Sequence, residues 1–118
     1  MKRRLEKTHD NVIGYSLAGE VTDSEYEQLL SELRDEVAKH GKIRLLFRLQ
    51  DLSAKSFFSA LDERFQFFSD HRDDVERVAI VSDESGMGFL SSVGDSMLPG
   101  ETDHFSGGDE SEAWAWLE

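Results

Sequence analysis

The most constraining feature of the sequence is a pair of short apolar segments separated by a long helical pattern. Ile43 to Leu49 is a short apolar run that carries Arg44 and Arg48. Val75 to Val81 ends in four consecutive apolar residues, which suits a strand covered on both faces. Between them, from about Ala54 to Arg72, apolar residues recur at helical spacing. Neighbouring parallel strands need a crossover connection of this kind. The sequence therefore predicts two interior, parallel strands joined by a helix.

The chain begins with a predicted β-hairpin. Leu5 to His9 and Val12 to Gly19 flank Asp10-Asn11, and these two residue types tolerate a tight turn. Ile13, Tyr15 and the residues around them alternate in polarity as a half-buried strand should. We therefore expect two antiparallel strands before the first helix.

The clearest predicted helix follows this hairpin. Thr22 and Glu25 form a capping box, and apolar residues then recur at helical spacing until His40-Gly41. Tyr26 and Val37 are the first and last members of this stripe. The spacing predicts one long amphipathic helix.

Three weaker elements follow the second interior strand. A helix capped by Asp83 or Ser85 ends before Pro99-Gly100. Thr102 to Phe105 forms a short edge strand, and Asp109 starts a last helix. The order ββαβαβαβα over 118 residues predicts one α/β domain, 1–118, with a mixed five-stranded sheet and right-handed crossovers.

Charge and composition restrict the classes of partner. The net charge of −12, from 25 acidic and 13 basic residues, repels phosphate backbones and anionic lipid headgroups. We expect neither nucleic acid nor an acidic membrane as partner. No segment approaches the roughly 20 apolar residues of a spanning helix, and the chain has no cysteine for a disulfide or thiolate metal site. The sequence is typical of a cytoplasmic protein, and the acidic excess favours adaptation to a high-salt cytoplasm as a hypothesis.

Four stretches of the sequence resemble the STAS superfamily, and most closely its SpoIIAA-like branch of small, stand-alone proteins. They cover almost the whole chain: residues 12–23, residues 40–47, Asp70-His71-Arg72 with Val75–Val81, and residues 113–117. The resemblance implies a β–α superhelix with helices stacked mainly on one side of the sheet. The superfamily contains anti-sigma-factor antagonists and transporter-associated modules, and none of the four stretches is a catalytic motif.

The resemblance does not extend to a phosphorylation switch. Anti-sigma-factor antagonists carry a phosphorylatable serine within an Asp-Ser-Ser-Gly motif, shortly after a strand-end Asp-Leu-Ser. Here Asp51-Leu52-Ser53 matches the strand end, but Ser59-Ala60-Leu61-Asp62 replaces the motif. Ala60 cannot accept a phosphate, and Ser59 is the nearest hydroxyl. Phosphorylation-driven partner switching is therefore not implied.

The sequence carries no strong signal for catalysis, a cofactor or a metal. Its four histidines have no pair at a spacing that places two imidazoles on one helix or strand face. The glycines of 86–91 lie between a strand and a helix, but they do not complete a dinucleotide-binding motif. Ser53, His71 and Asp83 supply the residue types of a Ser–His–Asp catalytic triad, but no local motif marks Ser53 as an activated nucleophile. We therefore expect a protein that is not an enzyme.

The candidate ligand or partner surface combines two loops with the Phe-rich helix. Open α/β sheets commonly bind ligands at the carboxyl ends of their strands, and phenylalanines spread around the crossover helix more widely than one buried stripe requires. Trp114 and Trp116 point about 200° apart on a helix, so both cannot face the same core and one of them is a candidate interface residue. The candidate residues are Asp51, Ser53, Ser56, Phe57, Phe58, Ser59, Asp62, Asp83, Ser85 and Trp116.

Two functions are compatible with these features. The first is a regulatory module that binds an unknown protein partner or a second copy of the chain as a homodimer. The second is a carrier or sensor of a small apolar, lipid-like ligand held between the Phe-rich helix and the sheet.

Overall fold

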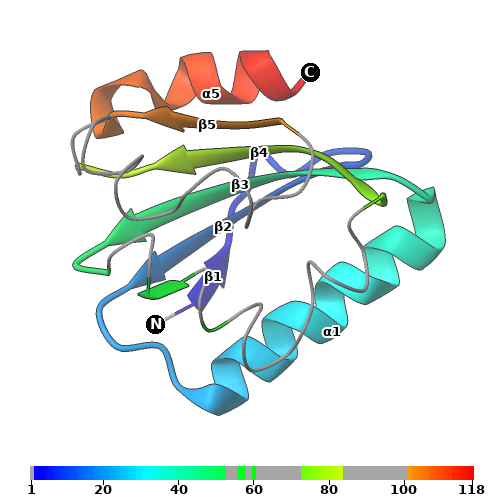
Figure 1. The fold of residues 1–118 in the computed structure, drawn as a ribbon, viewed down its shortest axis with the longest axis horizontal. Coiled ribbons are helices and arrows are strands. Elements are labelled where there is room, and N and C mark those ends of the chain that lie inside the picture. Colours follow the sequence, from blue (N-terminus) through cyan, green and yellow to red (C-terminus); the bar gives the residue numbers. More distant parts are fainter. Residues whose placement is uncertain (1, 53–55, 58–59, 61–72, 84–100) are drawn as a thin grey trace.

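The structure, a computed structural model, describes residues 2–52, 56–57, 60, 73–83 and 101–118. Five strands form one sheet, with helices on both of its sides (Figure 1). The strands are β1 (Lys2–Arg4), β2 (Val12–Ala18), β3 (Ile43–Gln50), β4 (Val75–Val81) and β5 (Glu101–Phe105). The helices are α1 (Asp23–His40), α5 (Glu110–Leu117) and the short 3-10 helix η3 (Gly107–Asp109).

The sheet has the strand order β1-β2-β3-β4-β5. Strand β1 is antiparallel to β2, whereas β2, β3, β4 and β5 run parallel to one another. Leu46 of β3 lies opposite Ala79 of β4, which confirms the predicted parallel pair. The mixed five-stranded α/β sheet is therefore confirmed. The bounds of β4 are the predicted ones, and the other predicted interior strand extends by one residue to Gln50.

Helix α1 begins and ends as its sequence predicts. The Thr22 hydroxyl accepts a hydrogen bond from the Glu25 amide at 3.2 Å, and the Glu25 carboxylate accepts one from the Thr22 amide at 3.3 Å. This reciprocal pair satisfies amides that the first helical turn leaves without partners. Gly41 then ends the helix with a φ of +83°, a left-handed conformation that glycine adopts without strain.

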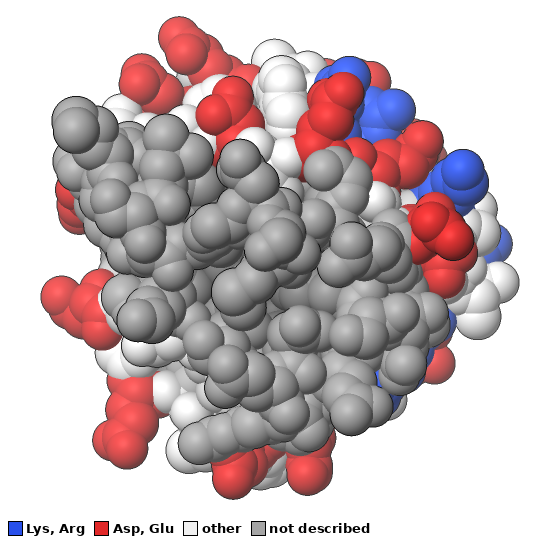
Figure 2. Space-filling model, in the orientation of Figure 1, with Lys and Arg blue, Asp and Glu red and all other residues white. Residues whose placement is uncertain are grey.

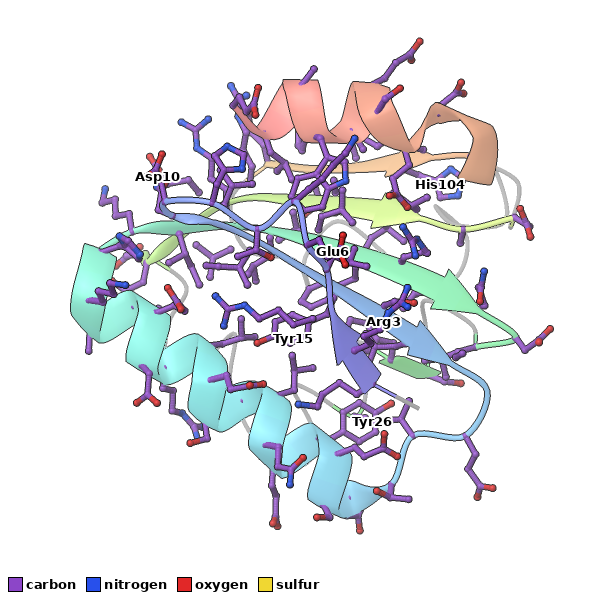
Figure 3. All side chains as sticks on the ribbon, turned by 180° about the vertical axis from the view of Figure 1, so that it is seen from behind. Arg3, Glu6, Asp10, Tyr15, Tyr26 and His104 are labelled. Atoms are coloured by element: carbon purple, nitrogen blue, oxygen red, sulfur yellow. The ribbon has the colours of Figure 1, made fainter. Side chains whose placement is uncertain are left out.

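The sheet separates two apolar cores, because successive side chains of a strand point to opposite faces. On the face of α1, Tyr15, Phe47 and Phe57 are fully buried with the apolar stripe of the helix. Tyr15 donates a hydrogen bond to Glu32 of α1 at 3.1 Å, and Figure 3 shows it between the sheet and this helix. On the opposite face, α5 packs on a smaller core, whose buried members are Leu5, Val12, Leu46, Ala79, Val81, Ala113, Trp114 and Leu117.

The opening hairpin is confirmed, but its first strand was placed wrongly. Strand β1 covers Lys2–Arg4, and the chain leaves the ladder after Leu5. His9 then pairs with Val12 through reciprocal backbone hydrogen bonds of 3.0 and 2.9 Å, so Asp10 and Asn11 form the predicted tight turn, with a φ of +48° at Asp10. The strand pairs with β2, and its cations have partners on α1: Lys2 pairs with Glu32 and Arg4 with Glu36, each at 3.0 Å. Sequence alternation cannot reveal such long-range pairs.

The predicted helices between β3 and β4 and between β4 and β5 fall almost entirely outside the described residues. Among the described helices, α1 covers one face of the sheet and α5 the other (Figure 1). The short edge strand is confirmed and starts one residue earlier, at Glu101. Within the described residues, no helix is long and apolar enough to span a membrane.

Candidate functional site

Three half-buried arginines form a cluster, the arginine cluster, on the α5 face of the sheet. Arg44 and Arg48 alternate with Leu46 along β3, and Arg77 lies in register beside Arg44 on β4. A cation beside an apolar core needs charged or polar partners, because its desolvation is otherwise unfavourable. All three arginines find such partners on α5.

Arg48 binds the first residue of α5 through a two-pronged ion pair. Its Nε and Nη2 atoms donate to the two carboxylate oxygens of Glu110 at 2.5 and 2.7 Å. The indole Nε1 of Trp114 also donates to Glu110, at 3.4 Å. Chiefly because of the hydrogen bonds from Arg48, the pKa of Glu110 lies below its ordinary value. Glu110 is therefore a fixed carboxylate at neutral pH.

Arg44 and Arg77 bind the opposite end of α5. Arg44 donates to the carbonyl of Leu117 at 2.7 Å, and Arg77 donates to the carbonyl of Trp116. Carbonyls in the last turn of a helix lack intrahelical partners and carry a partial negative charge, so a cation stabilises them. The guanidinium carbon of Arg77 also lies 5.2 Å from the ring centroid of Trp116, in cation–π contact. The arginine cluster thus fixes α5 on the sheet at both ends.

The two tryptophans of α5 lie on opposite sides of the helix, Trp114 toward β2 and Trp116 toward β5. Trp114 is buried and sits over Gly14 of β2, where a Cβ atom would come within 2.4 Å of its ring. Trp116 is half-buried and packs against Phe105 of β5, with ring centroids 5.8 Å apart. Both tryptophans nevertheless contact the same apolar core, because Trp114 is one of its buried members and Trp116 packs against its edge. The expectation that they cannot face the same core is therefore wrong.

A polar groove opens at the carboxyl ends of β3 and β4, where the sequence places the candidate loops. We call it the carboxyl-edge groove, and its volume is about 310 Å³. Strands β3 and β4, the segment after β4, η3 and α5 all contribute to its walls. The lining residues are Arg48, Leu49, Gln50, Val81, Ser82, Asp83, Gly107 and Glu110.

Ser82 and His104 meet beside this groove. The buried Ser82 hydroxyl lies 3.0 Å from Nε2 of His104, which comes from the neighbouring strand β5. The hydrogen bond joins the ends of two parallel strands, whose register pairs Ile80 with His104. Sequence reasoning did not bring these two residues together, because the position of β5 beside β4 is a property of the whole sheet.

A second cavity lies on the other side of the Arg48–Glu110 pair. We call it the β1 pocket; its volume is about 380 Å³. The turn after β1 forms one wall, and the start of α5 forms another. The lining residues are Arg3, Arg4, Leu5, Glu6, Lys7, Arg48, Glu110 and Trp114.

The structure brings some of the predicted site residues together and separates others from them. Asp51 and Asp83 are exposed at the ends of the neighbouring strands β3 and β4, and Asp51 has a φ of +54°. Ser56 is exposed, whereas Phe57 packs in the core with its ring centroid 4.7 Å from that of Phe47. Phe57 therefore contributes no exposed surface. Ser53, Phe58, Ser59, Asp62 and Ser85 lie outside the described residues.

The central pair of the site, Arg48 and Glu110, was not predicted from the sequence. One signal pointed to Arg48: Arg44 and Arg48 lie on the same face of a strand that is otherwise apolar, and such residues need partners. No local pattern identified Glu110 as the partner 62 positions away. Within the residues that the structure describes, no group of three His, Asp or Glu side chains could hold a metal ion.

Comparison with known proteins gives one positive result. The SpoIIAA-like family model matches residues 12–118. No curated protein and no solved structure matches the chain.

Proposed function

Because this chain belongs to the SpoIIAA-like family, we propose that it is a non-catalytic binding module that acts through protein–protein contacts. The observation that carries this proposal is the carboxyl-edge groove, an open and mainly polar depression beside two exposed acids. Carboxyl ends of parallel strands are a common location of binding sites in α/β sheets.

The groove offers hydrogen-bonding groups rather than an apolar cavity. Gln50 and Asp83 present exposed amide and carboxylate groups from adjacent strand ends, whereas the buried Ser82 hydroxyl is hydrogen-bonded to His104. At the groove wall, the charges of Arg48 and Glu110 already compensate each other, because the two side chains are joined by two hydrogen bonds. This lining suits the backbone and polar side chains of a protein segment.

The charge at the groove indicates the chemistry of the partner. Asp83 lines the groove and is exposed, Asp51 is exposed directly after the lining residue Gln50, and the whole chain carries −12. Complementary potentials accelerate encounter and suppress wrong partners. We therefore propose a partner with a basic or neutral polar contact surface, bound without a phosphoserine switch because Ala60 replaces the modified serine of the regulatory relatives.

A second, weaker proposal is that the chain is a carrier or sensor of a small apolar ligand. Phe57, the described phenylalanine of the Phe-rich segment that could have lined an apolar cavity, is fully buried between Phe47 and Tyr26. Native mass spectrometry of the freshly purified protein tests this proposal directly. A co-purifying apolar molecule in stoichiometric amount would favour the carrier over the protein-binding module.

Affinity purification with matched variants tests the protein-binding module. The tagged wild-type chain should enrich a specific protein from its native lysate, and Asp83→Arg should reduce that enrichment by about tenfold because it reverses a charge at the groove. Glu27→Arg makes the same charge change at an exposed position of α1, which packs on the opposite face of the sheet from α5, and should retain the partner.

Sedimentation of the purified chain separates a second copy from a different partner. A dimer that Asp83→Arg dissociates would identify the partner as the chain itself. If no protein is enriched and the chain is monomeric, or if Asp83→Arg and Glu27→Arg behave alike, the carboxyl-edge groove is not the contact surface.

A further inference from the structure

The β1 pocket gathers cations in a protein of strongly negative charge. Its lining includes Arg3, Arg4, Lys7 and Arg48, which are four of the 13 basic residues in the chain. Its volume of about 380 Å³ lies in the range of small-molecule sites, which is about 300–1,000 Å³. The β1 pocket is separate from the carboxyl-edge groove, although Arg48 and Glu110 line both of them.

The strand register places two of these arginines on one face of the sheet. Arg3 of β1 lies opposite Ser16 of β2, and Ser16 lies opposite Arg48 of β3. The three residues therefore form a row across neighbouring strands, with side chains that point to the same face. Helix α5 packs on this face, mainly against β3, β4 and β5, and reaches β2 through Trp114. Figure 3 shows the segment carrying Arg3 and Glu6, which runs from β1 toward α5.

The cations of the pocket differ in whether their charge is already compensated. Arg4 donates to Glu36 on the α1 face at 3.0 Å, and Arg48 is paired with Glu110. Arg3 and Lys7, by contrast, have neither an ion pair nor a side-chain hydrogen bond within the described part of the chain. The exposed Lys39 and Lys42 likewise have no side-chain partner within the described residues, but they do not line the pocket.

The positive charge of Lys7 acts on Glu110 in the wall of the β1 pocket. The pKa of Glu110 is lowered chiefly by the hydrogen bonds from Arg48, and the charge of Lys7 lowers it further. Glu6 and Glu110 are the carboxylates that line the pocket, against Arg3, Lys7 and Arg48. Three cations and two carboxylates leave one net positive charge, with Arg4 neutralised by Glu36.

We propose that the β1 pocket binds a small organic anion, a carboxylate or a phosphate ester, through Arg3 and Lys7, beside the Arg48–Glu110 pair. Arginine and lysine side chains form charge-assisted hydrogen bonds with both kinds of anion. The ring of Trp114 provides an apolar wall beside the charged group. A compact anion fits this local charge, whereas the −12 of the chain repels an extended polyanion.

Nuclear magnetic resonance can test the site, because one of the two tryptophans of the chain, Trp114, lines the β1 pocket and the other, Trp116, does not. The indole N–H of Trp114 lies at the pocket beside Glu110, whereas Trp116 lies on the other flank of α5 beside Arg77 and Phe105. ¹⁵N-labelled protein is titrated separately with inorganic phosphate and with citrate, while KCl keeps the ionic strength constant. We expect a saturable shift of the Trp114 indole signal with at least one of the two anions, and no shift of the Trp116 signal. The anion that binds identifies the chemical class.

Matched variants separate a specific site from a general response to charge. The double variant Arg3→Gln/Lys7→Gln should weaken binding by about tenfold, because it removes two charge-assisted contacts. Lys39→Gln removes an exposed cation at the end of α1, across the sheet from the pocket, and should leave the affinity unchanged. The amide spectra of all variants report directly whether the fold is retained.

Three results would overturn the anion site. They are the absence of a saturable shift with either anion, equal shifts of the two indole signals, and undiminished affinity in the double variant. The outcome is independent of the protein-binding proposal: Asp83→Arg should lose the protein partner and keep the anion.

Discussion

Arg48 and Glu110 connect the strand, the terminal helix and both cavities. The guanidinium of Arg48 stands among apolar side chains on β3, and the carboxylate of Glu110 satisfies two of its donors. The two side chains are 28% and 21% exposed, so the pair is screened less than a surface ion pair. At the scale of single residues, this pair has the clearest energetic consequence.

Glu110→Gln should destabilise the protein at neutral pH by about 1 kcal/mol, since it replaces a charged two-pronged contact with a neutral one. The folded state lowers the pKa of Glu110 below that of the unfolded chain. Its contribution is therefore fully present above the unfolded pKa and is lost as the pH falls through the folded pKa. Urea unfolding at pH 7 and at several points below about pH 4.5 should show the difference between wild type and variant disappearing with acid.

Glu112→Gln is the matched control for this experiment, because Glu112 is an exposed acid of the same helix. It should change the free energy of unfolding much less at every pH. A Glu110→Gln penalty that stays constant from pH 7 to pH 3 would show that the ionised pair is not its source.

At the scale of elements, the contact of α5 with the sheet depends on a missing side chain. Gly14 of β2 leaves room for Trp114, and a Cβ atom there would lie 2.4 and 2.8 Å from two atoms of its ring. Gly14→Ala should therefore displace the helix and destabilise the fold by about 1–3 kcal/mol. Chemical denaturation followed by tryptophan fluorescence measures the loss of stability, and the emission spectrum of the native protein reports the displacement around Trp114.

A double-mutant cycle distinguishes this overlap from a change in strand propensity. With Trp114→Leu already present, Gly14→Ala should cost clearly less, because the smaller side chain removes the collision. Additive penalties would exclude the Gly14–Trp114 contact as the cause.

The start of α1 provides an independent test at the same scale. Thr22→Ala removes the hydroxyl that accepts from the Glu25 amide, and we expect a loss of about 1 kcal/mol in the free energy of unfolding. Ser31→Ala, at an exposed interior position of α1, should be neutral or slightly stabilising because alanine favours helix. Thermal or urea unfolding of both variants is the measurement, and equal stabilities of Thr22→Ala and wild type would contradict the role of the cap.

Elements whose signals are local were predicted from the sequence, and elements set by distant contacts were not. The capping box and Gly41 define α1 within a few residues, and the apolar run defines β4. Strand β1 was missed because Lys2 and Arg4 have no apolar pattern and pair with carboxylates of α1. Local propensity contains no term for such tertiary pairs.

The same distinction applies to the candidate site. The carboxyl ends of β3 and β4 followed from the alternation of strands and helices, so Asp51 and Asp83 could be placed near one edge before the structure was known. The second cavity could not be predicted, because it requires the register of β1 on β2 and the docking of α5 beside it. Both depend on the assembled sheet.

At the scale of the whole molecule, the dominant property is the uncompensated negative charge. Asp and Glu prevail over Lys and Arg on the described part of the face in Figure 2. The radius of gyration is 12.9 Å, which is shorter than the Debye length of about 30 Å at 0.01 M salt. At low salt, therefore, acids on all sides of the fold repel one another.

Added salt should consequently raise the melting temperature, by several degrees between 0.01 and 1 M KCl. At 1 M the Debye length falls to about 3 Å, so long-range repulsion is removed while the partly buried Arg48–Glu110 pair is weakened much less. The variant Glu27→Lys/Asp35→Asn changes two exposed positions of α1 by three charge units, from −12 to −9, and should gain less from salt. Melting curves across the salt series measure both slopes. A melting temperature that falls with KCl would mean that ion pairs outweigh the repulsion, and it would exclude the high-salt adaptation that the composition suggests.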